Sequence, residues 1–145
     1  MKVGLLLALV IAVTGQALYH VTQKSVAAGA HPIISLMVFY LVAALATLPL
    51  FWLFPVAGTL TEEWAKLNWA VVGVAISIVL IEIGFLLAYR AGGELSTAFV
   101  MTAAVVAISM LLVGALFFGE TFSVSKVGGV LLCLAGIGLI SYKSA

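Results

Sequence analysis

The sequence predicts an all-helical, polytopic membrane protein, a bundle of five transmembrane helices. Its composition is 66% apolar and 8% charged, against roughly 45–50% and about 25% in soluble domains, and its mean hydropathy is +1.37. Five apolar segments each approach the roughly 20 residues that a helix needs to cross the hydrocarbon core. Helices are expected because, in lipid, backbone polar groups must be satisfied within the segment. We therefore expect a multi-pass protein of the cell (inner) membrane, in contact with the lipid bilayer.

The predicted spans are separated by helix breakers and together form a single domain, residues 1–145. They cover about residues 3–23, 33–54, 69–89, 95–118 and 127–142. The connections contain His31-Pro32, Pro55 with Gly58, Gly92-Gly93 and Gly119-Glu120. In the longest connection, the stretch from Thr59 to Glu62 is typical of a capping box that opens a short interfacial turn around Trp64.

The first span also resembles a secretory signal peptide. Lys2 precedes an apolar run over residues 5–13, and Gly15 and Ala17 are spaced like a cleavage site. The apolar character continues to Tyr19, which favours a retained helix. Cleavage near residue 17 stays open as an alternative, and it would leave four helices.

The positive charges divide evenly between the two membrane faces that five crossings create. The face that holds the N-terminus has Lys2, Lys66 and Lys126, and the other has Lys24, Arg90 and Lys143. Because loop lysines and arginines set orientation, an even division predicts a weak preference or insertion in both orientations. An even split is also the commonest chance outcome for six charges, so sampling noise is the alternative.

Several function classes find little support in the sequence. A net charge of +1 without a basic stripe gives no indication of a nucleic-acid partner. Cys133 is the single cysteine, so neither an intrachain disulfide nor a cysteine metal cluster is available. No nucleophile–base pair, metal-ligand cluster or phosphate loop is found. We therefore expect no enzyme activity, no metal and no cofactor.

Glu82 is the only acidic residue inside a predicted span. A charge near the bilayer centre costs roughly 2.5–3.5 kcal/mol on insertion scales, so such residues are rare and usually face a bundle interior or an aqueous cavity. Apolar surroundings disfavour the charged form, so this carboxyl group can hold a proton and exchange it for a substrate. Phe85 and Tyr89 lie on the same side of the helix and can stack against a cation. The alternative is a protonated glutamate that donates an interhelical hydrogen bond.

Polar residues of the first span gather on one helix face. Gln16, Tyr19, His20 and Gln23 follow the i, i+3, i+4, i+7 pattern. This pattern predicts a face that lines a cavity or contacts a partner. A lone histidine is, however, more often a solvated edge residue.

The fourth and fifth spans carry small and weakly polar residues. Thr102 and Ser109 share a face and can bind a ligand, although such hydroxyls more often bond to their own backbone. Gly129, Cys133 and Gly136 are at small-residue spacing, which allows another backbone to approach closely. This contact is either packing within one bundle or a seam between two copies.

Four stretches of the sequence carry motifs whose order and spacing resemble those of a known family. They are TGQALYHVTQK, AHP, AYRAGGELSTAFV and LLVGALFFGETFSVSKVGGVLLCLAGIGLIS. Together they resemble, over essentially the whole chain, one EamA-type repeat of the drug/metabolite transporter superfamily, with its GE motif at the end of helix four and its glycine-rich fifth helix. Ala107 stands where members often carry a proline, so a mechanism that relies on a kink in helix four is in doubt.

The resemblance implies transport. Family members usually have two such repeats in opposite orientations, with the substrate site at their interface, and both halves are needed for alternating access. This chain has one repeat, so we expect a second copy in an antiparallel homodimer. The smaller four-helix multidrug members are similar in this arrangement, but their essential glutamate is on the first helix, so its role is not transferred to Glu82 by position.

We therefore predict a secondary-active, proton-coupled exporter of small metabolites or amphipathic organic cations. The predicted substrate and proton site comprises Glu82, Gln16, Tyr19, His20, Phe85, Tyr89, Thr102 and Ser109. Two alternatives stay open: a subunit of a heteromeric lipid-carrier flippase or half-transporter, and a non-transporting membrane scaffold.

Overall fold

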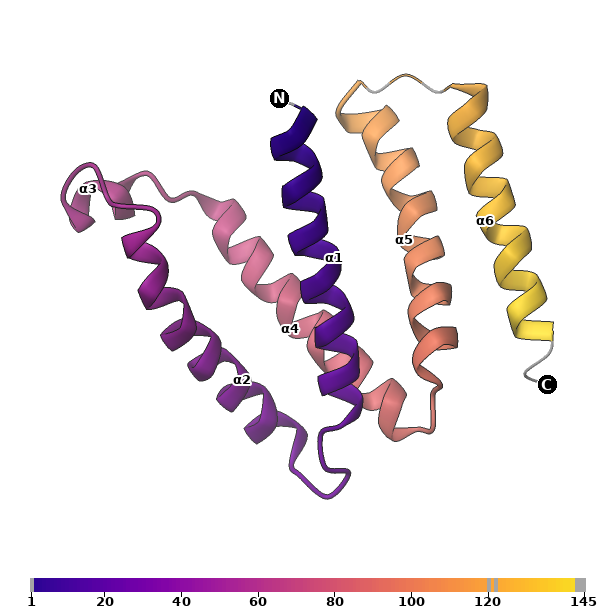
Figure 1. Cartoon of the computed structure of the whole chain (residues 1–145), viewed down its shortest axis with the longest axis horizontal. Coiled ribbons are helices and arrows are strands. Elements are labelled where there is room, and N and C mark those ends of the chain that lie inside the picture. Colours follow the sequence, from indigo (N-terminus) through magenta and orange to yellow (C-terminus); the bar gives the residue numbers. More distant parts are fainter. Residues whose placement is uncertain (1, 120, 122, 143–145) are drawn as a thin grey trace. The chain divides into compact units, whose positions relative to one another are not determined.

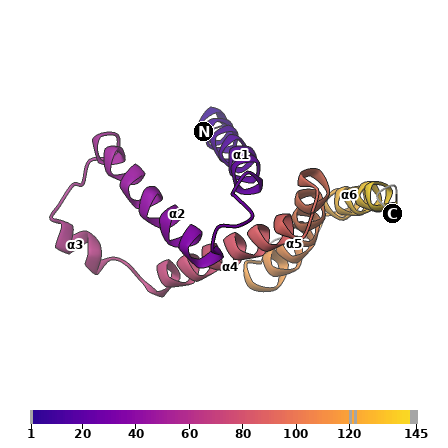
Figure 2. The ribbon, with the colours of Figure 1, turned by 90° about the horizontal axis from the view of Figure 1, so that it is seen from below.

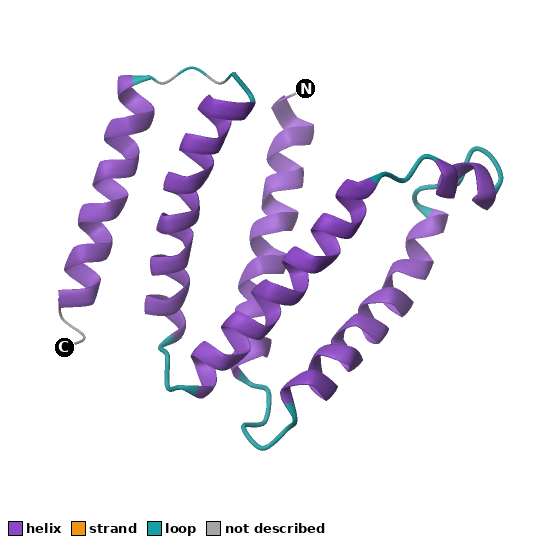
Figure 3. Cartoon of the chain, turned by 180° about the vertical axis from the view of Figure 1, so that it is seen from behind, coloured by secondary structure: helices purple, strands orange, loops and turns teal. Residues whose placement is uncertain are grey.

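The computed structural model describes residues 2–119, 121 and 123–142, which form helices joined by turns, without a strand in this part of the chain (Figure 1). Figure 3 shows the same helices from behind. In chain order they are α1 (Lys2–Lys24), α2 (Pro32–Thr47), the 3-10 helix η1 (Leu48–Trp52), α3 (Leu60–Ala65), α4 (Trp69–Arg90), α5 (Leu95–Phe117) and α6 (Val124–Tyr142). The predicted all-helical class is confirmed.

Four helical stretches are long and apolar enough to cross a bilayer. They are Val3–Lys24, Pro32–Trp52, Trp69–Arg90 and Leu95–Phe117. The fifth predicted span corresponds to a shorter apolar stretch, Val124–Leu139, within α6. With its 19 residues, α6 is about 28 Å long, close to the roughly 30 Å thickness of the hydrocarbon core.

The second span changes helix type near its end. α2 ends at Thr47, and the chain continues as the 3-10 helix η1 to Trp52. Pro49 has no backbone N–H, and its ring clashes with the carbonyl group four residues earlier. The backbone therefore changes from an α-helix to the more tightly wound 3-10 helix near Pro49.

The predicted capping box at α3 is confirmed. The hydroxyl group of Thr59 accepts a hydrogen bond from the backbone N–H of Glu62 at 3.3 Å, and the Glu62 carboxylate accepts one from the backbone N–H of Thr59 at 3.1 Å. These reciprocal bonds satisfy two donors that a helix start leaves open.

The chain divides into two compact units, each described by itself below. Unit 1 contains Met1–Lys24 and Ala91–Ala145, and unit 2 contains Ser25–Arg90. In unit 1, α5 contacts both α1 and α6, and Figures 1 and 2 show α5 and α6 side by side. In unit 2, α2 packs against α4. That residues 1–145 form a single domain stays a prediction.

Most large apolar side chains are exposed, while several polar ones are buried. Trp69 is 83% exposed and Ile11 is 73% exposed, whereas His20 and Gln23 are only 5% and 4% exposed. This distribution suits a chain whose apolar surface is covered by lipid rather than by water. The membrane-spanning helices therefore contact the bilayer directly.

Basic side chains secure the ends of α1 and α4. In unit 1, the ammonium group of Lys24 donates a hydrogen bond to the carbonyl oxygen of Gly93 at 3.2 Å. In unit 2, the guanidinium group of Arg90 donates to the carbonyl oxygen of Ala27 at 3.4 Å. Gly92, in the connection after α4, has a φ of +91°, which only glycine adopts without strain.

Candidate functional site

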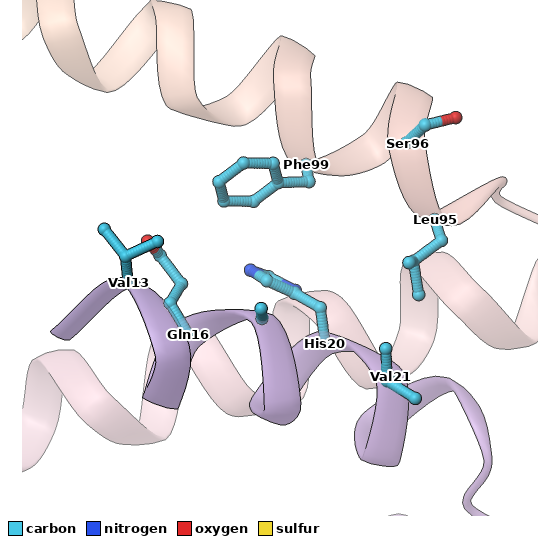
Figure 4. A pocket seen from close by; sticks show the side chains of 8 residues that line it. Val13, Gln16, His20, Val21, Leu95, Ser96 and Phe99 are labelled. Carbon is cyan, nitrogen blue, oxygen red and sulfur yellow. The ribbon is translucent and has the colours of Figure 1, made fainter. Parts of the chain in front are cut away.

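In unit 1, α1 and α5 enclose a cavity of about 260 Å³. Its walls come from Val13, Gln16, Ala17, His20 and Val21 of α1 and from Leu95, Ser96 and Phe99 of α5 (Figure 4). The volume lies just below the roughly 300–1,000 Å³ of typical small-molecule pockets. The cavity therefore suits a small ligand or one apolar part of a larger ligand.

Helical periodicity explains which residues reach the cavity. The α1 residues are spaced i, i+3, i+4, i+7 and i+8, which places them on one helix face. On α5, Leu95 and Phe99 are four residues apart and lie on the same side of the first turns. The cavity is thus lined by one continuous face from each helix.

His20 forms part of the cavity wall through its ring. Its imidazole is edge-to-face with the ring of Phe99, at a centroid distance of 4.8 Å and an interplanar angle of 60°. A second edge-to-face contact, also at 4.8 Å, joins it to Tyr19. Figure 4 shows Phe99 and His20 facing each other across the cavity, with Gln16 beside them.

The lining allows several kinds of contact with a ligand. The imidazole nitrogens of His20 and the side-chain amide of Gln16 can donate or accept hydrogen bonds. The face of Phe99 can contact an aromatic group or a cation. The lining surface as a whole is almost entirely apolar, so a mostly hydrophobic ligand, or the apolar part of a larger one, fits this chemistry.

The predicted polar face of α1 divides between cavity and packing. Gln16 and His20 line the cavity, whereas Tyr19 is half-buried beside His20 and Gln23 is buried near the end of the helix. Sequence reasoning missed Phe99. An aromatic residue in an apolar span carries no pattern that separates it from a residue that faces lipid.

Glu82 lies on α4 in unit 2 and is half-buried. Its carboxylate is close enough to the hydroxyl group of Tyr40, on α2, for the two to interact electrostatically. The Tyr40 hydroxyl is buried and has no hydrogen-bond partner among the described residues. A buried polar group without a partner costs about 1–3 kcal/mol, so an acceptor that comes within reach of this hydroxyl group is favoured. Tyr40 was also missed by sequence reasoning.

Phe85 and Tyr89 follow Glu82 along the same helix. Their rings are stacked, with centroids 5.9 Å apart and an interplanar angle of 27°. Glu82, Phe85 and Tyr89 are spaced i, i+3 and i+7, so they share one face of α4. This face combines a carboxylate with two aromatic rings, the combination that binds organic cations.

Thr102 and Ser109 bond to their own helix. The Thr102 hydroxyl donates to the carbonyl oxygen of Ala98 at 2.9 Å, and the Ser109 hydroxyl donates to that of Val105 at 2.8 Å. Both residues are exposed, and neither lines the cavity between α1 and α5.

The small residues of α6 leave open space on one side of the helix. Gly129 and Cys133 line a groove beside α5, and Gly136 is half-buried. A Cβ atom placed at Gly129 or Gly136 meets no heavy atom of the described residues within 4 Å. Within this part of the chain, no other backbone approaches these glycines closely.

The long apolar helices and their exposed apolar surface define a polytopic, all-helical membrane protein. The chain belongs to the EamA-like transporter family, whose model matches residues 2–142. It is therefore a membrane transporter of the drug/metabolite transporter type, in a family of transporters rather than enzymes. No solved structure was found to match the chain. Of the residues singled out in the sequence, Glu120 of the GE motif and Lys143 lie outside the described residues.

Among the described residues, no three His, Cys, Asp or Glu side chains are grouped so that they can hold a metal ion.

Proposed function

We propose that this transporter is a proton-coupled exporter of small metabolites or amphipathic organic cations, and that Glu82 exchanges a proton for the substrate. The observation that carries the proposal is the position of Glu82. It is the only acidic residue in the sequence of the membrane-spanning helices, and it is half-buried beside a buried tyrosine hydroxyl group.

The charge of the bound substrate couples substrate binding to the release of the proton from Glu82. In apolar surroundings the neutral carboxylic acid is favoured over the carboxylate, so Glu82 holds a proton when no cation is near. A bound cation stabilises the carboxylate instead, and the proton leaves. Phe85 and Tyr89 stack against the cation, and Tyr40 donates a hydrogen bond to the carboxylate that has lost its proton.

The cavity between α1 and α5 is the proposed lining of the substrate entrance. His20 and Gln16 supply its polar groups, Phe99 supplies an aromatic surface, and Tyr19 holds His20 in place. Thr102 and Ser109 contact the substrate only if their hydroxyl groups give up the hydrogen bonds that they now donate to backbone carbonyl oxygens.

A second copy in the opposite orientation is the proposed partner. The even division of lysines and arginines between the membrane faces is compatible with insertion both ways round. An antiparallel copy supplies the inverted half that alternating access requires. The open space beside Gly129, Cys133 and Gly136 is the proposed seam.

Proton release on substrate binding tests the proposal. Purified protein in weakly buffered detergent solution is mixed with tetraphenylphosphonium, an amphipathic cation, while a pH indicator is followed. We expect release from the wild type, none from Glu82→Gln, and release at an altered pH from Glu82→Asp. Equal release from the wild type and from Glu82→Gln removes the assignment.

The two alternatives predict different results. A half-transporter or flippase subunit that pairs with a different protein gives cross-linked products that contain two different chains. A scaffold without transport activity retains every measurable activity when Glu82 is replaced by Gln.

A further inference from the structure

The connection between η1 and α4 contains a short helix that no other helix supports. This connection covers residues 53–68 and includes α3 (Figure 1). α3 has only six residues, and isolated helices shorter than about 12–15 residues are marginal in water. In the described part of the chain, α3 packs against no other helix. Its capping box satisfies backbone donors at the start of the helix but covers none of its apolar side chains.

α3 has an apolar side and a polar side. Leu60 and Trp64 are four residues apart and are therefore neighbours on one helix face. Both are exposed, Trp64 to 73%. Glu62 and Lys66 lie on the opposite side, because each residue turns the helix by about 100°. The Glu62 carboxylate is held there by its hydrogen bond from the backbone N–H of Thr59. We call Leu60 and Trp64 the α3 apolar face.

The position of the connection indicates which partner covers the α3 apolar face. The connection begins directly after Trp52, the last residue of one membrane-spanning stretch, and ends directly before Trp69, the first residue of the next. Because both stretches contact the bilayer, the connection lies at one membrane surface. Tryptophan is enriched at this level, since its ring is apolar while its N–H group is polar.

We propose that α3 lies in the lipid interface, with the α3 apolar face inserted just below the head groups and with Glu62 and Lys66 in water. Amphipathic helices bind membrane surfaces in this orientation. The interfacial turn expected from the sequence thereby gains a defined face. Docking holds the ends of the two flanking spans at one depth in the bilayer.

Apolar contact, rather than charge, provides the affinity of α3 for lipid. From residue 59 to residue 68 the sequence contains Glu62, Glu63 and Lys66 as its charged residues. Lys66 is paired with Glu63 at 2.6 Å, so the connection offers no basic patch to anionic head groups. Binding to the interface then follows the apolar area that is buried. This inference does not depend on proton coupling at Glu82.

Tryptophan fluorescence measures the depth of Trp64. The chain contains three tryptophans, so Trp52→Phe together with Trp69→Phe leaves Trp64 as the only one. The full chain with these two substitutions is reconstituted in phosphatidylcholine vesicles whose acyl chains carry bromine, a quencher, either close to the head group or at the far end. We expect stronger quenching by bromine close to the head group than by bromine at the chain end, and little quenching by iodide dissolved in the water.

Two further substitutions in this protein test the α3 apolar face. Leu60→Gln should reduce quenching by bromine close to the head group to about half or less, because binding to the interface scales with the buried apolar area. The matched control is Ala65→Gln, which introduces the same side chain at an exposed position of α3 outside the α3 apolar face, and it should leave the quenching unchanged. Circular dichroism confirms that each variant is folded.

The lipid composition tests the role of charge. Replacing part of the phosphatidylcholine with phosphatidylglycerol should leave the quenching unchanged, because α3 presents no basic patch. A marked increase with phosphatidylglycerol contradicts docking by apolar contact.

Four other results overturn the proposal. One is strong quenching by iodide with none by either brominated lipid, which places Trp64 in water. Another is strongest quenching by bromine at the chain end, which places Trp64 in the hydrocarbon core. The third is an equal loss of quenching in Leu60→Gln and Ala65→Gln. The fourth is quenching by lipid that falls as the ratio of protein to lipid rises, which identifies a second copy as the partner.

Discussion

The imidazole of His20 on α1 lies edge to face with the ring of Phe99 on α5, with the two centroids 4.8 Å apart. His20 is 5% exposed although it belongs to a membrane-spanning helix, and both residues line the same cavity. The contact therefore has two consequences: it joins α1 to α5, and it places a group that can bind protons beside an aromatic surface.

A double-mutant cycle should detect the contact between His20 and Phe99. Aromatic pairs contribute about 0.5–1.5 kcal/mol beyond their buried area, so His20→Ala and Phe99→Ala should show a coupling energy in this range. Unfolding in mixed micelles measures it. The control pair is His20→Ala with Met101→Ala, because Met101 is an exposed residue of the same helix. The coupling energy of this control pair should be near zero. A coupling of zero for the first pair contradicts the account of this contact.

Filling the cavity should block ligand binding without unfolding the protein. Ala17 lines the cavity, and a phenylalanine at this position occupies the space that a ligand needs. We expect Ala17→Phe to bind tetraphenylphosphonium at least about tenfold more weakly, a change of 1.4 kcal/mol, in a calorimetric titration. Ala12→Phe, on the same helix but outside the cavity lining, is the control. Unchanged affinity in Ala17→Phe excludes the cavity from the binding site.

The connection between α4 and α5 should depend on Gly92. Its φ of +91° places any residue with a Cβ atom in a strained conformation, at a cost of about 1–2 kcal/mol. Gly92→Ala should therefore lower the free energy of unfolding by about this amount. Gly29→Ala, in the turn after α1, replaces a glycine without a positive φ or a close neighbour, and we expect a change below about 0.5 kcal/mol. If the two variants are equally stable, the strain argument is wrong.

Insertion in both orientations should be visible by labelling intact cells. In a Cys133→Ser background, single cysteines are introduced at Ala28 and at Leu67, two exposed loop positions that leave the charges unchanged. A reagent that does not cross membranes should label part of the molecules at each position. A lysine added beside residue 28 should shift the two labelled fractions in opposite directions, because positive loops favour the cytoplasmic side. Complete labelling at one position and none at the other rules out dual insertion.

The sequence was sufficient to predict the helices because long apolar segments in a membrane have few alternatives to helix. Periodicity also predicted the shared face of Gln16 and His20, since residues three and four apart are neighbours on any helix. The change to a 3-10 helix at Leu48–Trp52 was not predicted, although Pro49 is the local signal for it.

The partners of the candidate site residues could not be predicted in the same way. Phe99 contacts His20, and Tyr40 lies near Glu82. In each pair, the two helices are rotated about their axes so that these side chains face each other. A uniformly apolar span gives no indication of this rotation, since its hydrophobic residues are distributed all around the helix. Tertiary contacts, rather than spacing, bring these residues together.

Infrared difference spectroscopy of the Glu82 carboxyl group tests proton exchange most directly. The protonated acid has a carboxylic C=O stretching band, which disappears when the proton leaves. We predict that tetraphenylphosphonium removes this band from wild-type protein, and that Glu82→Gln shows no such difference. A cation that binds while the wild-type band stays unchanged would contradict the proposal that Glu82 exchanges its proton for the substrate.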